Sequence, residues 1–102
     1  MKLISPDRTF LYYLCDRNDG MSHGIRISRA MGAVGFVSDI PSAQQRHPVP
    51  FSMFDDPAVR LPAVAADLPP ILQNALGEIE DMHPEIHEVL SGQITFDDAL
   101  RL

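Results

Sequence analysis

Residues 9–28, TFLYYLCDRNDGMSHGIRIS, carry the clearest structural signal in the chain. After its threonine, TFLYYLC is apolar or aromatic at both alternating sets of positions, which is typical of a β-strand covered on both faces. The segment DRNDG ends in Asn, Asp and Gly, the residue types that tolerate the positive φ of a tight turn. HGIRIS (23–28) then alternates isoleucine with arginine and serine. Together these segments predict a β-hairpin.

The residues after the hairpin predict a third strand followed by a long loop. VGFVSDI (34–40) has the alternation and composition of a third strand, which gives a three-stranded antiparallel β-meander over about residues 8–40. PSAQQRHPVP (41–50) is polar and rich in proline, so we expect a long exposed connection. The predicted loop spans residues 41–61, with a short helical turn at FDDPAVR (54–60).

Helical periodicity begins in the second half of the chain. Asp67 is a suitable N-cap for LPPILQNALGEIEDM (68–82), because the two prolines fall in a first turn where missing amide donors cost little. Pro84 interrupts the pattern, so either the helix kinks there or it ends near Asp81, which then caps a second helix. The apolar residues at helical spacing are Leu72, Leu76, Ile79, Met82, Ile86 and Leu90.

The C-terminal residues predict a helix that stops at Gly92 and a short helix that opens with a capping box of Thr95 and Asp98. The predicted fold class is therefore α+β, in which two or three C-terminal α-helices (62–102) pack on one face of the meander (1–40). The residues expected to form most of the core are Phe10, Leu14, Ile25, Ile27, Phe36, Leu72, Leu76, Ile79, Ile86, Leu90 and Leu100.

The bulk properties of the chain indicate an ordinary globular protein. Its 102 residues suffice for one modest core, so residues 1–102 are predicted to form a single domain. Cys15 is the only cysteine, which excludes an intramolecular disulfide and indicates a reducing compartment. No apolar run has the length of a signal peptide or approaches the ~20 residues of a membrane span. We therefore expect a cytoplasmic protein without a membrane partner.

The net charge of -6 is distributed unevenly. Residues 1–50 hold six bases and four acids, whereas residues 51–102 hold two bases and ten acids. No Lys or Arg lies between Arg60 and Arg101. The acidic half repels phosphate backbones, so direct nucleic-acid binding through it is disfavoured.

Four acidic residues of this half recur at spacings of three and four: Glu78, Asp81, Glu85 and Glu88. On a continuous helix they form one carboxylate face beside the apolar stripe. Like charges four apart destabilise a helix by roughly 0.2–0.5 kcal/mol per pair, so stability alone favours interspersed bases. The face is either a solvated surface or one that meets a basic partner. We predict these four as partner-binding residues.

Two pairs of residues supply alternative sites. Cys15 and His23 lie opposite each other if the hairpin loop has three residues, and a nearby imidazolium lowers the pKa of a thiol. The simpler interpretation is a small core cysteine. His83 and His87 share a helix face, as zinc ligands do, but Pro84 stands where the zinc-protease pattern requires glutamate. The simpler interpretation is a pair of exposed histidines beside a helix joint.

The aromatic residues Phe10, Tyr12 and Tyr13 could form a stacking platform for single-stranded nucleic acid, with nearby arginines. Adjacent residues on a strand point to opposite faces, however, so one tyrosine belongs to the core. The segment MGAVG (31–35) has neither of the glycine spacings that bind phosphates.

The leading hypothesis is a small acidic, non-enzymatic protein-binding module, such as a bacterial regulator, an immunity protein or a phage-type inhibitor. It presents the carboxylate face to a basic surface of a protein partner. The alternatives are a small enzyme that uses Cys15 and His23, a metal-binding protein that uses His83 and His87, and a structural subunit of a larger complex or homo-oligomer. No cofactor is expected.

Overall fold

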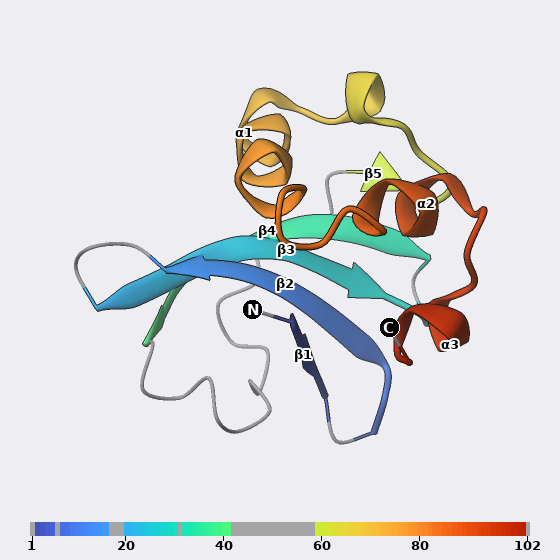
Figure 1. Ribbon diagram of the computed structural model, residues 1–102, viewed down its shortest axis with the longest axis horizontal. Coiled ribbons are helices and arrows are strands. Elements are labelled where there is room, and N and C mark those ends of the chain that lie inside the picture. The colour runs from blue at the N-terminus through green and yellow to red at the C-terminus, as the bar shows by residue number, and fades with distance from the viewer. Residues whose placement is uncertain (1, 6, 17–19, 31, 42–58, 102) are drawn as a thin grey trace.

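The computed structural model of the protein describes residues 2–5, 7–16, 20–30, 32–41 and 59–101. Within these ranges the chain forms a five-stranded antiparallel sheet, in the order β1-β2-β3-β4-β5, and three short α-helices (Figure 1). The strands are β1 (Lys2–Ile4), β2 (Phe10–Asp16), β3 (Met21–Ser28), β4 (Ala33–Pro41) and β5 (Val59–Arg60), and the helices are α1 (Pro70–Ile79), α2 (Ile86–Ser91) and α3 (Phe96–Ala99). The α+β prediction is confirmed, but the sheet has five strands rather than three.

Strands β2 and β3 form the predicted hairpin. Cys15 lies opposite His23 in the register, and Gly20 takes the positive φ expected of the turn, 81°. Both faces of β2 are covered, because Tyr12 and Tyr13 point to opposite faces and are 1% and 0% exposed. β4 confirms the third strand, so the predicted meander forms the centre of the sheet.

The sequence patterns miss the two outer strands. β1 pairs with β2, where Lys2 lies opposite Tyr13, and β5 pairs with the start of β4, where Val59 lies opposite Val34. The prediction of a helical turn at residues 54–60 is wrong for Val59 and Arg60, because these residues form β5. The same strand occupies part of the loop predicted for residues 41–61. The remaining loop prediction concerns residues 42–58, which lie outside the described residues. Strands of three and two residues are too short to show alternation, so only their partners identify them.

Asp67 does not cap α1, contrary to the prediction. It ends a short 3₁₀ turn, Ala65–Asp67, where its carboxylate accepts a hydrogen bond from the backbone N–H of Val64 at 3.2 Å. The N-cap of α1 is Pro69, and Pro70 is its first residue. An N-cap side chain accepts from the second or third N–H of its helix. With Asp67 as the cap these positions are prolines, which have no N–H.

Pro84 separates two helices, in agreement with one of the two predicted arrangements. α1 ends at Ile79 and α2 begins at Ile86. Asp81 lies in the intervening turn and does not cap α2, whose N-cap is Glu85. Because the helix does not continue, Met82 leaves the apolar stripe that it was expected to extend and is 56% exposed.

The helix stop at Gly92 and the N-cap at Thr95 are confirmed. Gly92 ends α2 with a φ of 84°, and the hydroxyl of Thr95 accepts a hydrogen bond from the backbone N–H of Asp98 at 3.1 Å. The Nζ of Lys2 donates to the carbonyl oxygen of Ala99 at 2.7 Å, which joins β1 to α3. Across the described ranges, no helix combines the length and the apolar character needed to cross a membrane.

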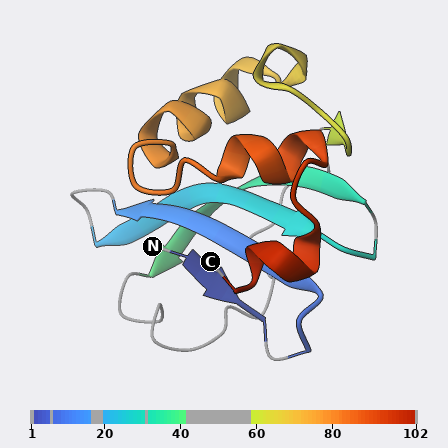
Figure 2. The same cartoon turned by 45° about the vertical axis from the view of Figure 1, so that its right-hand side comes forward.

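The helices lie on one face of the sheet (Figures 1 and 2). On this face a core cluster joins β2, β3 and β4 to all three helices, and a smaller cluster of Tyr12, Leu14 and Val37 lies on the other face. Phe10, Phe36 and Leu100 were expected in the core but are only partly buried. The predicted core residues that are buried are Leu14, Ile25, Ile27, Leu72, Leu76, Ile79, Ile86 and Leu90.

Candidate functional site

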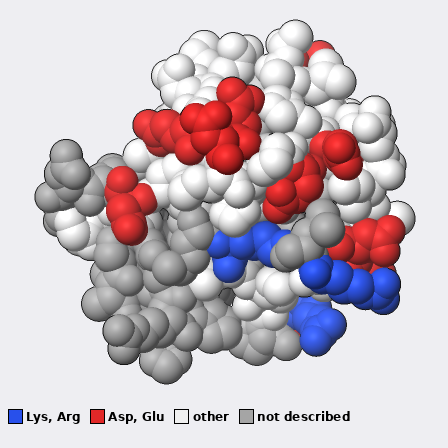
Figure 3. Space-filling model, viewed as in Figure 1, with Lys and Arg blue, Asp and Glu red and all other residues white. Residues whose placement is uncertain are grey.

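The predicted carboxylate face is bent, because its four residues come from three segments. Glu78 lies on α1, Asp81 in the turn, Glu85 at the N-cap of α2 and Glu88 on α2. Figure 3 shows Asp and Glu side chains gathered over the helices, whereas the Lys and Arg side chains of the same view lie on the side of β1. The helix is not continuous across Pro84, so the four residues do not form one straight helix face, but they still occupy one layer of the molecule. We call Glu78, Asp81, Glu85 and Glu88 the acidic face.

Four hollows follow one another along this layer, and each shares a residue with the next. The strand-edge hollow has a volume of about 410 Å³ and lies between β4 and α1. The Cys15 hollow has a volume of about 460 Å³ and lies at the end of β2. Both hollows are lined by Glu78. Met82 connects the Cys15 hollow to the turn hollow, of about 540 Å³. Glu88 connects the turn hollow to the α2 hollow, of about 220 Å³. The acidic face is thus a corrugated surface rather than a flat one.

Three members of the acidic face line these hollows, and apolar side chains line them too. Glu78 lines the first two hollows, Glu85 the third, and Glu88 the third and fourth. Asp81 is exposed in the turn between them. Met82, which lines the second and third hollows, is one of three large apolar residues that are more than half exposed in the described part of the chain. Carboxylates and accessible apolar surface therefore occur side by side.

Two residues of the acidic face have histidine neighbours. The Nε2 of His23 lies 2.5 Å from a carboxylate oxygen of Glu78, and the Nδ1 of His83 lies 3.6 Å from one of Glu85. Burial lowers the pKa of His83, although the carboxylate of Glu85 acts in the opposite direction. Within the described ranges, neither Asp81 nor Glu88 forms an ion pair.

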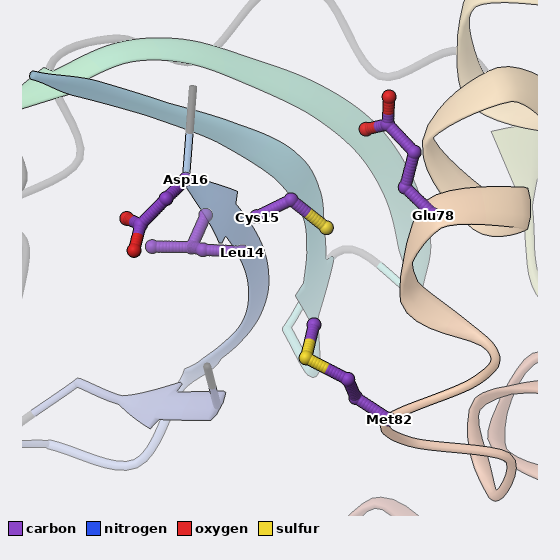
Figure 4. A pocket seen from close by; sticks show the side chains of 5 residues that line it. All are labelled: Leu14, Cys15, Asp16, Glu78 and Met82. Carbon is purple, nitrogen blue, oxygen red and sulfur yellow. The ribbon is translucent and has the colours of Figure 1, made fainter. Parts of the chain in front are cut away.

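The predicted pairing of Cys15 with His23 is confirmed, but the surroundings do not favour a reactive thiolate. Burial raises the pKa of the Cys15 thiol, and the carboxylates of Glu78 and Asp16 raise it further. The thiol points into the Cys15 hollow, on the side of Met82 (Figure 4). A cysteine nucleophile needs a lowered thiol pKa. The structure places His23 opposite Cys15, but the pKa of the thiol is raised rather than lowered.

His83 and His87 do not share a helix face, contrary to the prediction. His83 precedes α2 and packs on the ring of Tyr13 with a centroid separation of 5.3 Å, whereas His87 lies on α2 and bonds to Glu80 at 2.7 Å. The helix break at Pro84 separates the two imidazoles. Among the described residues, no group of three or more His, Cys, Asp or Glu side chains is arranged to hold a metal ion.

The aromatic residues of β2 do not form an exposed platform. Tyr12 and Tyr13 are both buried, and the guanidinium of Arg26 lies 4.3 Å from the centre of the Phe10 ring. The guanidinium of Arg29 packs on Phe96 at 4.7 Å. These two arginines are therefore already in contact with aromatic rings of the protein itself.

The strand-edge hollow and the exposed Met82 were not predicted. The only sequence signal for the exposed Met82 is Pro84, because a break at this position directs the neighbouring apolar residue out of the stripe. The strand-edge hollow depends on how α1 packs on the sheet, and no local pattern indicates it. No protein-family model, curated protein or solved structure matches the chain. A function has to be inferred from the residues and geometry of the chain itself.

Proposed function

We propose that the protein is a non-enzymatic binding module whose acidic face meets a basic surface of a protein partner. The observation that carries the proposal is the coincidence of the acidic face with the row of hollows. A purely solvated acidic surface has no need of accessible apolar pockets beside its carboxylates. A regulator, an immunity protein or a phage-type inhibitor acts in this way.

The hollows suit the side chains of basic residues. Lys and Arg each carry a charged end on an apolar stem, and such a stem gains by lying along apolar surface. In the turn hollow, Met82 and Ile94 supply apolar surface, and Glu85 and Glu88 supply negative charge. A basic side chain that enters there buries its stem and keeps its charge beside a carboxylate.

The charges of the acidic face are available at modest cost. Asp81 and Glu88 have no ion pair to break within the described part of the chain, and the partners of Glu78 and Glu85 are histidines. A lysine or arginine is charged at every physiological pH and is therefore a better counterion than a histidine. Complementary charges speed association, and salt weakens the effect.

The test is affinity capture of partners from an extract of the source cells with immobilised protein. The variant Asp81→Lys/Glu88→Lys reverses two charges of the acidic face without breaking a described ion pair. The control Asp67→Lys/Asp98→Lys makes the same change of net charge at exposed positions outside the face. We expect wild-type and control proteins to capture the same partner, and the acidic-face variant to lose it.

The salt dependence provides a second measurement. Capture by the wild type should weaken as salt is raised, and any residual capture by the acidic-face variant should weaken much less. If the variant captures the same proteins with the same salt dependence as the wild type, the acidic face is only solvated and the proposal fails.

A further inference from the structure

The outer edge of β4 is largely uncovered by the other strands of the described part. β5 pairs only with Ala33 and Val34, whereas β4 continues to Pro41. The carbonyl oxygen of Gly32 accepts a hydrogen bond from Leu61 and thus points to the outer side. Backbone groups alternate along a strand, so the N–H and C=O of Phe36 point to the same side. Within the described residues, the edge therefore presents a donor and an acceptor beyond the end of β5.

A groove runs along this edge. One wall is the sheet, which contributes Phe36 and Ser38 of β4 and His23 of β3, and the other is α1. The residues of α1 that line it, Ile71, Asn74, Ala75 and Glu78, have the spacing of one helix face. Between the two walls lies the strand-edge hollow, of about 410 Å³. The layers are visible in Figure 1, where α1 lies above the sheet.

The groove combines apolar and acidic surface. Ile71 is 51% exposed, although it is a large apolar residue, and it lies in the same hollow as the partly buried ring of Phe36. The side chain of Glu78 is 52% exposed and brings a carboxylate to the same hollow. Its described ionic partner there is His23. A ligand of this groove should therefore carry both an apolar and a basic side chain.

We propose that this groove binds an extended segment of the protein partner, which adds to β4 as a sixth strand. Main-chain hydrogen bonds to the edge supply affinity, and alternate side chains of the added strand enter the groove, as in other cases of strand addition. An apolar side chain packs between Ile71 and Phe36, and a Lys or Arg two residues away reaches Glu78. The proposal rests on the proposed function and specifies how the partner binds.

The chemistry of the segment follows from the charge and geometry of the groove. Side chains two apart on a strand point to the same face, so the apolar and basic residues must be separated by one residue. The net charge of -6 favours a basic segment over an acidic one. A helical ligand cannot use the backbone groups of the edge, because its own are bonded internally.

The probe is a displayed library of random decapeptides selected against the intact protein, and selected peptides are then synthesised. We expect enrichment of sequences with an apolar residue and a Lys or Arg two positions apart. Ile71→Arg should weaken their binding about tenfold or more, because it places a positive charge at the apolar contact. The control Ala66→Arg introduces the same charge at an exposed residue that lines none of the four hollows and should leave binding unchanged.

Hydrogen exchange tests the strand addition itself. On binding of a selected peptide, the amide of Phe36 should become protected. Methylation of the peptide nitrogens that face β4 should abolish binding, whereas methylation of the alternate nitrogens should not. The inference is overturned if no peptide is selected, if binding leaves the amide unprotected, or if the amide is already protected in the free protein.

The two proposals fail in distinguishable ways. If Asp81→Lys/Glu88→Lys abolishes partner capture and Ile71→Arg does not, the binding module stands and the strand addition is wrong. If selected peptides bind at β4 but reversal of the acidic face leaves partner capture unchanged, the groove stands and the role of the acidic face is wrong.

Discussion

The hydroxyl of Tyr13 is buried and has no hydrogen-bond partner within the described residues. Burial raises the pKa of this tyrosine, and the nearby carboxylate of Glu85 adds to the effect. A buried polar group without a partner costs about 1–3 kcal/mol. Tyr12, the next residue, lies on the opposite face, and its hydroxyl shares a hydrogen bond with the side chain of Arg26. The two tyrosines therefore differ in that the hydroxyl of Tyr12 has a hydrogen-bond partner and the hydroxyl of Tyr13 has none within the described residues.

We expect Tyr13→Phe to leave the free energy of unfolding unchanged or to raise it by up to about 1 kcal/mol, because it removes an unsatisfied group. Tyr12→Phe is the matched control and should lower it by about 1 kcal/mol. Urea denaturation measures both. Equal destabilisation by the two substitutions would mean that the Tyr13 hydroxyl has a partner.

His83 links stability to pH. Burial lowers its pKa below the ordinary value of 6.5, so the folded protein holds the imidazole neutral where the unfolded chain begins to protonate it. Below pH 6.5 the unfolded state binds more protons, and stability falls until the pH passes the folded pKa. This contribution is fully present above the unfolded pKa and is lost on acidification.

The prediction is tested with His83→Gln, whose side chain is neutral at all pH values. Between about pH 7.5 and about pH 5, the wild type should lose more unfolding free energy than the variant. Denaturant titrations at several pH values give the two curves. Parallel curves would show that the His83 pKa is the same in the folded and unfolded states.

At the scale of elements, the hairpin depends on one glycine of β3. A Cβ added to Gly24 would lie 1.9 Å from the carbonyl oxygen of Tyr13 on the neighbouring strand, so β2 and β3 would have to separate. Gly77 is a contrasting case, because it lies on the exposed side of α1 and a Cβ there meets nothing within 4 Å.

Gly24→Ala should lower the free energy of unfolding by about 1–3 kcal/mol through overpacking. Gly77→Ala should raise it by about 0.5–1 kcal/mol, because alanine is the better helix former. Thermal and denaturant unfolding of both variants measures the difference in sign. A neutral Gly24→Ala would indicate that the two strands adjust without cost.

The same elements show how far sequence patterns reach. The hairpin, β4 and the stop at Gly92 are predictable because each depends on residues within a few positions of one another. β1 and β5 depend on pairing with distant strands, and three or two residues hold no pattern of their own. Asp67 fails as a cap because the prolines that mark a helix start also remove the N–H groups that the cap needs.

At the scale of the whole molecule, the four residues of the acidic face could be picked out from the sequence, but the hollows beside them could not. Glu78, Asp81, Glu85 and Glu88 stand out by spacing and by the absence of bases among them. The hollows depend on how α1 lies over the sheet and on the break at Pro84, which exposes Met82. No pattern of neighbouring residues in the sequence predicts the distance between the helices and the sheet.

The proposed binding surface should carry a cost in stability. Asp81→Lys should raise the free energy of unfolding at low salt by about 0.3 kcal/mol, because it relieves repulsion along the acidic face at a position in the turn between α1 and α2. The gain should shrink in about 1 M NaCl, where the Debye length is only about 3 Å. Asp98→Lys is the control and should not stabilise, since it removes an acid from the first turn of α3.

Denaturant titrations at both salt concentrations measure these changes in the free energy of unfolding. If Asp81→Lys destabilises the protein at low salt, the carboxylate of Asp81 makes favourable contacts within the fold. Its role would then be structural.

The chain has one cysteine, and its thiol points into the hollow that lies between the strand-edge hollow and the turn hollow. A trifluoromethyl label attached to Cys15 by disulfide exchange would place a fluorine reporter in the middle of the row without any substitution. Because burial raises the pKa of the thiol, labelling should proceed faster in mildly alkaline buffer than at neutral pH. The chemical shift and linewidth of that single resonance would then follow the arrival of a ligand in a neighbouring hollow, in the native sequence and in solution.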